Sequence, residues 1–143
     1  MCGIAGMLGR MPAGRSMRSG CESMIDALAH RGPDDRGLFE APGDPLVMGH
    51  RRLSIIDPSA AGHQPMTSRC GRWTVVFNGE VYNASALAGE PSRSEPWRGH
   101  SDTEVLVERI AQHGVEAAAR AAVGMFAFAA WDDRESTLHL VRD

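Results

Sequence analysis

The second residue of this 143-residue chain is a cysteine that directly follows the initiator methionine. If Met1 is removed, the thiol and a free α-amino group stand on the same residue, and their ordinary pKa values, about 8.5 and about 8, lie close together. Such an amine can take the thiol proton at neutral pH, as it does in N-terminal nucleophiles. A small buried side chain is the simpler interpretation of Cys2 taken alone.

Asn78 and Gly79 form a second feature with possible chemistry. Asn-Gly between two β-rich runs is the strongest short-range signal for a tight hairpin turn, so a plain turn is the simpler interpretation. The chemical alternative is that the Asn amide and the Gly N–H are aimed at one point, where they would stabilise a developing oxyanion.

Two charged residues could bind the ends of an amino acid. Arg52 stands in the apolar segment HRRLSIID, where an arginine needs a partner. That partner is either a neighbouring carboxylate or a ligand carboxylate held by two hydrogen bonds. Asp102 in SDTE is either an acidic residue that the helix dipole favours in a first turn, or a carboxylate that binds the ammonium group of a substrate. Each signal is weak alone, but their co-occurrence is not.

Hydrophobic periodicity predicts the elements that must position these residues. Strands are expected over 2–8, 37–40 and 45–56, in two runs within 73–83 that join at Asn-Gly, and on both sides of a turn within 124–141. Helices are expected over 17–30, 84–89, 101–114 and 115–122, and a variable loop over 89–100. Ser101 and Glu104 have capping-box spacing at the start of the third helix. This order predicts an α+β layered domain.

Composition excludes several classes of protein. A net charge of −3 provides no basic surface for nucleic acid. Three cysteines without metal-like spacing indicate neither a zinc site nor a disulfide framework, and favour the reduced thiols of the cytoplasm. No apolar segment reaches the length of a membrane span. We expect a cytoplasmic protein with no metal, nucleic acid or membrane partner.

Several segments occur in one order along the chain, namely MCGIAG, HRGPDD, RRLSIID, HQPM, FNGEVYN, SDTEV and GMFAFAAWD. Together they resemble the glutaminase domain of asparagine synthetases that use glutamine, which belongs to the class II glutamine amidotransferases. The resemblance covers essentially the whole chain and implies the N-terminal nucleophile (Ntn) hydrolase fold, a four-layer αββα sandwich. Relatives with other acceptors, such as glucosamine-6-phosphate synthase, do not usually carry RLSIID or GMFAFA, which favours the asparagine synthetase branch.

The resemblance also implies a role for each candidate residue. Cys2 would be the nucleophile with its own amine as base, and Asn78 and Gly79 would bind the oxyanion. Arg52 would hold the α-carboxylate of glutamine, and Asp102 its α-ammonium group. The other implied contacts with glutamine are Leu53, Ser54, Ile55, Ile56 and Glu80. The chain would then hydrolyse L-glutamine to glutamate and ammonia through a Cys2 thioester.

Family members continue beyond the segment that matches LHLVRD here. The resemblance therefore implies that the domain over 1–143 is incomplete at its C-terminus and that the synthetase domain is absent. ATP and Mg²⁺ are expected only for that missing domain, and no cofactor is expected in this chain. The implied partners are L-glutamine and an asparagine-synthetase-type acceptor domain, in the same or a separate chain, and a homodimer stays open.

Three hypotheses about function remain at this point. The ammonia could go to an asparagine synthetase, or to a different acceptor, as in natural-product or polysaccharide amidation. The chain could instead be an inactive truncated fragment. A general Ntn acylase or peptidase fits less well, because Arg52 together with Asp102 suits a free amino acid better than a peptide.

Overall fold

The computed structural model describes residues 2–89 and 96–143. Its strands are β1 (Gly3–Leu8), β2 (Asp35–Glu40), β3 (Leu46–Arg52), β4 (Met66–Thr67), β5 (Trp73–Val81), β6 (Gly124–Asp132) and β7 (Thr137–Arg142). Its helices are α1 (Met17–Ala27), α2 (Ala84–Ala88), α3 (Asp102–His113) and α4 (Val115–Ala121), with a short 3-10 helix at Ala60–Gly62. The predicted α+β class is confirmed. Met1 and residues 90–95 of the loop expected over 89–100 lie outside the described residues.

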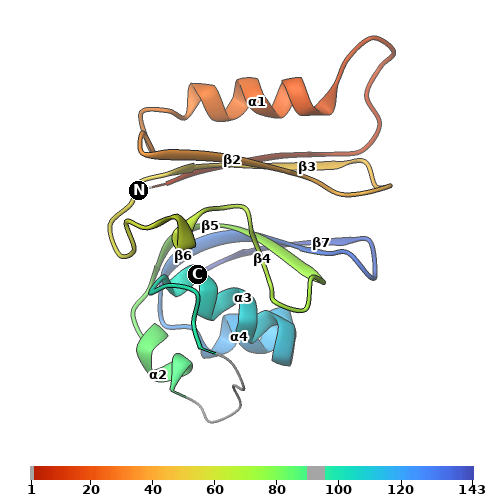
Figure 1. The fold of residues 1–143 in the computed structure, drawn as a ribbon. Helices are drawn as coiled ribbons and strands as arrows, with labels where there is room; N and C mark the ends of the chain where they lie inside the picture. The colour runs from red at the N-terminus through yellow and green to blue at the C-terminus, as the bar shows by residue number, and fades with distance from the viewer. Residues whose placement is uncertain (1, 90–95) are drawn as a thin grey trace.

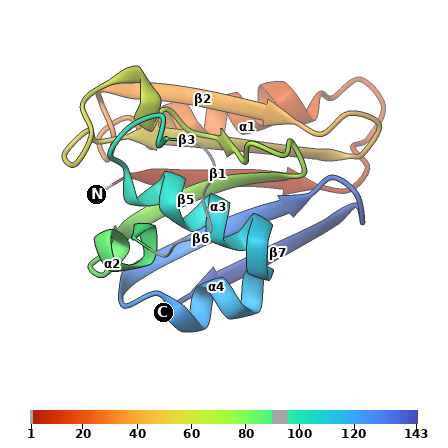
Figure 2. The same ribbon diagram turned by 60° about the horizontal axis from the view of Figure 1, so that its bottom comes forward.

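Two antiparallel sheets face one another, and helices cover their outer faces (Figure 1). The first sheet has the order β1-β3-β2, and the second has the order β4-β5-β6-β7. Helix α1 packs on β1 and β3, while α3 packs on β5 and α4 packs beside α3. Figure 2 shows α3 and α4 crossing the outer face of the second sheet.

Helix α1 fixes the start of the chain. Its side chains Cys21 and Ile25 are fully buried, and a Cβ added at Gly49 of β3 would lie only 2.6 Å from Ile25 Cγ2. The same close approach recurs at Gly3, where a Cβ would lie 2.9 Å from Leu28 Cβ. Glycines therefore let α1 settle directly on the first sheet, and this contact holds the residue that follows Cys2.

Helix α3 begins as the capping-box spacing predicts. The Ser101 side chain accepts the Glu104 backbone N–H at 3.1 Å, and Gly114 ends the helix with φ +83°. Leu106, Val107 and Ile110 are buried against the outer face of the second sheet. The cap and this packing therefore fix the position of the first turn of α3 relative to β5.

The expected turn at Asn78 and Gly79 is wrong. Both residues lie inside β5, which pairs continuously with β6 from Trp73↔Asp132 to Val81↔Gly124. Gly79 has φ +150°, and a Cβ there would collide with the Met125 carbonyl oxygen across the pair. The glycine serves a close approach between strands, which the local sequence signal cannot distinguish from a turn.

The strand expected over 45–56 ends earlier, at Arg52, because the chain then bends around the Arg52 side chain. The two strands expected within 124–141 are confirmed as β6 and β7. β7 pairs only with β6 and forms an edge of the second sheet among the described residues.

Strand alternation determines which side chains face the space between the sheets. Ile4, Met48 and Trp131 meet there in an apolar cluster. Cys2 and Arg52 share their parity with Ile4 and Met48, so both side chains face the second sheet.

Candidate active site

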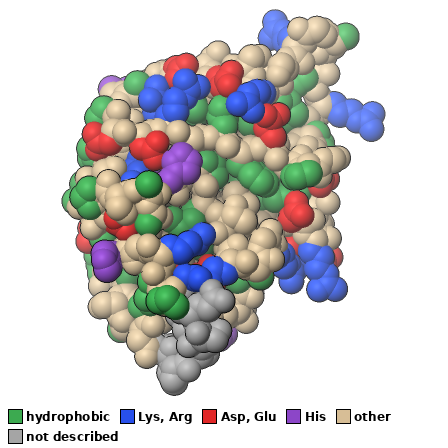
Figure 3. Space-filling model, viewed as in Figure 1, with side chains coloured by type: hydrophobic (Ala, Val, Ile, Leu, Met, Phe, Trp, Pro, Cys, Tyr) green, Lys and Arg blue, Asp and Glu red, His purple; other side chains and the backbone are tan. Residues whose placement is uncertain are grey.

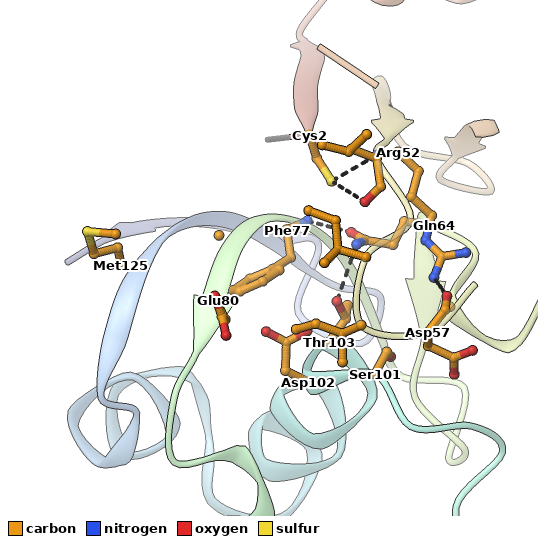
Figure 4. A pocket seen from close by; sticks show the side chains of 15 residues that line it. Cys2, Arg52, Asp57, Gln64, Phe77, Glu80, Ser101, Asp102, Thr103 and Met125 are labelled. Carbon is orange, nitrogen blue, oxygen red and sulfur yellow. Dashed lines mark hydrogen bonds between the residues drawn. The ribbon is translucent and has the colours of Figure 1, made fainter. Parts of the chain in front are cut away.

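A pocket of about 260 Å³ lies where the end of the first sheet meets the open edge of β5. It brings together most of the residues singled out by sequence, namely Cys2, Arg52, Leu53, Ile55, Ile56, Gly79, Glu80 and Asp102. In Figure 4, Cys2 and Arg52 approach from the first sheet, Glu80 from β5 of the second sheet, and Asp102 from the start of α3. Ser54 and Asn78 are not among the lining residues.

Cys2 lies just before β1, with its thiol at the pocket. Its Sγ accepts the Leu53 backbone N–H at 3.4 Å and lies 3.8 Å from the Leu53 carbonyl oxygen. The Nε of Arg31, in the segment HRGPDD, donates to the Cys2 carbonyl at 2.9 Å. Contacts from two separate loops therefore hold both the main chain and the side chain of Cys2.

Arg52 is buried at the end of β3 and is satisfied by main-chain carbonyls, not by the neighbouring carboxylate considered above. Its Nη1 donates to Ser59 O at 3.0 Å, and its Nη2 donates to Asp57 O. Gly62 lies so close to the guanidinium that a Cβ there would collide with it. A guanidinium has five N–H donors, so donors beyond these two bonds remain for a ligand at the pocket.

Asp102 is the first residue of α3 and is only 7% exposed. Burial raises the pKa of its carboxyl group, although the Val81 N–H, donated to Oδ2 at 2.9 Å, opposes that shift. The exposed Glu80 lies close enough for its negative charge to raise the same pKa further. Two carboxylates at one end of the pocket therefore favour a cationic ligand group.

The open edge of β5 carries the main-chain donors of the site. The Phe77 N–H donates to Gln64 Oε1 at 2.7 Å, and the Val81 N–H donates to Asp102. Neither N–H is used in the ladder with β6, and antiparallel alternation places the Gly79 N–H on the same side. Gly79 also lines the pocket, so its N–H is a candidate donor there.

Asn78 has the opposite parity to Gly79, so its side chain faces the space between the sheets. Its Oδ1 is buried and has no hydrogen-bond partner among the described residues. The structure thus brings Gly79 to the pocket but not Asn78.

Sequence reasoning assigned no role to three side chains that organise this region. Gln64 bridges the two sides of the pocket, because its Nε2 donates to Thr103 Oγ1 at 3.2 Å while its Oε1 accepts from Phe77. His50 Nε2 donates to the Phe77 carbonyl at 3.0 Å, and burial lowers the pKa of His50 to about 4. The Asp57 carboxylate accepts the Ser59 N–H and the His100 N–H, and so joins the loops that contain these two residues. The sequence signals were two segments: HQPM, which contains Gln64, and HRRLSIID, which begins at His50 and ends at Asp57.

Among the described residues, no group of three or more His, Cys, Asp or Glu side chains is placed to hold a metal ion. None of the helices in the described ranges is long and apolar enough to cross a membrane. On the face drawn in Figure 3, acidic and basic side chains lie next to one another.

Several known proteins are similar in sequence to this chain. A family model described as a glutamine amidotransferase domain matches residues 1–143. The glutamine-hydrolyzing asparagine synthetase 1 of Bacillus subtilis is 34% identical over 146 residues, which cover 100% of this chain and 22% of that protein. The glutamine-hydrolyzing asparagine synthetase 3 of Arabidopsis thaliana is 36% identical over 143 residues, which cover 100% of this chain and 24% of that protein.

A fungal protein from Gibberella zeae, named Amidase chry2, is 34% identical over 122 residues, which cover 85% of this chain and 18% of that protein. The chain therefore spans about a quarter or less of the length of these relatives. The pocket at Cys2 and the match over the whole sequence agree, and this chain belongs to the glutamine amidotransferase domain family.

Proposed function

We propose that the chain hydrolyses L-glutamine to glutamate and ammonia through a thioester on Cys2. The observation that carries this proposal is that Cys2, Arg52 and Asp102 line one pocket. Glutamine has a carboxylate and an ammonium group at one end and a neutral amide at the other. The pocket offers a cation, an anion and a thiol for these three groups.

Binding orients the substrate before any chemistry occurs. Arg52 binds the α-carboxylate through the donors that Asp57 and Ser59 leave free, and Asp102 binds the α-ammonium group with support from Glu80. Leu53, Ile55 and Ile56 form an apolar wall along the substrate. Two fixed charges at one end deliver the amide carbon to Cys2 in an attack geometry, which removes much of the entropic cost of the reaction.

The reaction then proceeds in two steps. The Cys2 thiolate attacks the amide carbon, the new C–S bond forms, and the Gly79 N–H stabilises the oxyanion, with the Asn78 amide as a second donor once its side chain turns toward the pocket. The C–N bond breaks as the N-terminal ammonium, which holds the proton taken from the thiol, protonates the leaving amide nitrogen, so that ammonia departs. Water then attacks the thioester, which releases glutamate and restores the thiol.

This mechanism needs the N-terminal amine as its base, so Met1 must be removed. The arrangement of helix, two facing sheets and helices supports assigning the chain to the N-terminal nucleophile hydrolase fold. That assignment is part of the same proposal, because in this fold the first residue supplies both nucleophile and base.

The proposed acceptor of the ammonia is an asparagine-synthetase-type domain, because the relatives that cover the whole chain carry that name. ATP and Mg²⁺ would serve that domain, and this chain would need no cofactor. A different acceptor is the second candidate, because one relative is named an amidase and not an asparagine synthetase.

The mechanism can be tested with a diazoketone analogue of L-glutamine, which forms a stable adduct with the attacking thiol. We expect one adduct on Cys2, located by mass spectrometry, in a chain that has lost Met1. The matched control is the same reagent without its α-amino group, which should react far more slowly. An adduct at Cys21 or Cys70, or none in chain lacking Met1, contradicts the mechanism.

A further inference from the structure

Asp57 lies in the loop after β3, at the rim of the pocket and only 4% exposed. Its Oδ1 accepts the Ser59 N–H at 2.9 Å and the Ser59 hydroxyl at 2.6 Å. Its Oδ2 accepts the His100 N–H at 2.7 Å. One buried carboxylate thus joins two loops that are far apart in the sequence.

The first of these loops holds Arg52. The guanidinium donates to the carbonyls of Asp57 and Ser59, and the Asp57 side chain fixes Ser59 relative to its own backbone. Figure 4 shows Arg52 directed toward Asp57 at one side of the pocket. The carboxylate therefore sets the position of both carbonyls that orient the guanidinium.

The second loop leads into α3. His100 directly precedes Ser101, the residue that caps the helix, and Asp102 follows. Gly99 approaches so closely that a Cβ there would collide with Asp57 Oδ2. The bond from the His100 N–H therefore fixes the residue before the Ser101 cap, two residues from Asp102.

From these contacts we propose that Asp57 is a positioning residue that sets the spacing between Arg52 and Asp102, and thereby matches the pocket to the α-carboxylate and α-ammonium groups of a free amino acid. The inference rests on the proposed function, because it assigns those two residues to the two charged groups of glutamine.

The charge state of Asp57 supports this role. Hydrogen bonds from the His100 N–H and from Ser59 lower the pKa of Asp57 to about 2, so the group stays ionised in the neutral range. An ionised carboxylate accepts stronger hydrogen bonds than a neutral amide does. The link between the two loops therefore depends on the charge as well as the shape of the side chain.

The test is the variant Asp57→Asn in the full chain. Asparagine keeps the size of the side chain and can still accept from Ser59, but it presents an amide N–H to the His100 N–H. We expect the KM for L-glutamine to rise about tenfold or more while kcat changes by less than about threefold, because ground-state and transition-state binding are lost together. Alkylation of Cys2 by iodoacetamide, which needs no amino-acid site, should keep its wild-type rate.

Two further variants define the effect. Gly99→Ala should reproduce the rise in KM by displacing the second loop. Asp133→Asn, the same change at an exposed residue beyond the far end of β6, should leave both constants unchanged. If Asp57→Asn does not fold, Ser59→Ala removes one of the three bonds and should raise KM about two- to threefold, the effect of one modest hydrogen bond.

Unchanged KM in Asp57→Asn, or in both Gly99→Ala and Ser59→Ala, would overturn the inference while wild-type glutaminase activity upholds the proposed function. A loss confined to kcat, or an equal loss of alkylation by iodoacetamide, would also overturn it by indicating damage to the nucleophile. A wild-type chain lacking Met1 that neither hydrolyses glutamine nor forms the diazoketone adduct overturns the proposed function and this inference together.

Discussion

The Asp102 carboxylate accepts the Val81 backbone N–H at 2.9 Å, which ties the first residue of α3 to the last residue of β5. The bond has two consequences. It satisfies a donor on the open edge of β5, and it holds a buried acidic group at the pocket that Gly79 also lines.

The variant Asp102→Asn should separate these two consequences. The amide oxygen of the new side chain can still accept the Val81 N–H, so we expect the melting temperature to stay close to the wild-type value. The KM for glutamine should rise about tenfold or more, because the charge opposite the α-ammonium group is lost. Steady-state kinetics and thermal melts measure the two effects. An unchanged KM would remove Asp102 from the binding site.

The pH dependence of binding should carry the signature of the same group. Burial raises the pKa of Asp102 above its ordinary value of 3.8, and ammonium binding needs the ionised form. We expect kcat/KM to fall as the pH drops through that raised value, and this acid limb should be absent in Asp102→Asn. The contribution to stability has the opposite sign: it is present below pH 3.8 and is lost as the pH rises through the raised pKa.

Gly79→Ala should destabilise the chain. The new Cβ would collide with the Met125 carbonyl, and φ +150° is unfavourable for any residue with a side chain. We expect a loss of about 1–3 kcal/mol in the free energy of unfolding, measured by urea denaturation. Gly43→Ala is the matched control, because Gly43 also has positive φ but open space around it, and it should cost less. Equal losses would show that the cross-strand contact does not matter.

Gln64→Leu should destabilise the open edge of β5. The variant leaves the buried Phe77 N–H and the Thr103 hydroxyl without their partner, which costs about 1–3 kcal/mol for a buried unsatisfied group. Thr103→Val removes only the second bond, so the loss should be smaller. Urea denaturation of both variants checks the order. A Gln64→Leu chain as stable as wild type would show that the Phe77 N–H finds another acceptor.

His50 should make the folded state sensitive to mild acid. Burial lowers its pKa from 6.5 to about 4, so the unfolded chain binds more protons between those values. The free energy of unfolding should therefore fall as the pH drops from 6.5 toward 4. His50→Gln can still donate to the Phe77 carbonyl but does not titrate, so its stability should change less over this range. Identical pH profiles would contradict the assignment.

The sequence by itself determined the family, the α+β class and the elements with strong local signals. Helix α3 is the clearest case, because its cap at Ser101, its apolar stripe and its final glycine all act within a few residues of one another. Cys2, Arg52 and Asp102 could also be named as candidates, because each residue type suits one group of an amino acid, and the resemblance named the other candidate contacts with glutamine.

Only the tertiary structure determined that Asn78 and Gly79 lie within a strand and not in a turn. Their local pattern favours a turn, but pairing of β5 with β6 along nine residues outweighs a two-residue preference. That pairing also leaves the Gly79 N–H on the open edge of β5 and places the Asn78 side chain on the face toward the first sheet. The partners of Arg52 were equally hidden, because they are carbonyl groups that any residue would supply.

The roles of Gln64, His50 and Asp57 were not predictable for the same physical reason. Each satisfies a backbone group of another segment: Phe77 for the first two and His100 for the third. Which backbone N–H or carbonyl lacks a partner in the sheet depends on where β4 ends and on the path of the loops. Both are properties of the folded chain. Residue types and spacing thus determined which groups could do the chemistry, and tertiary packing decided which of them meet at the pocket.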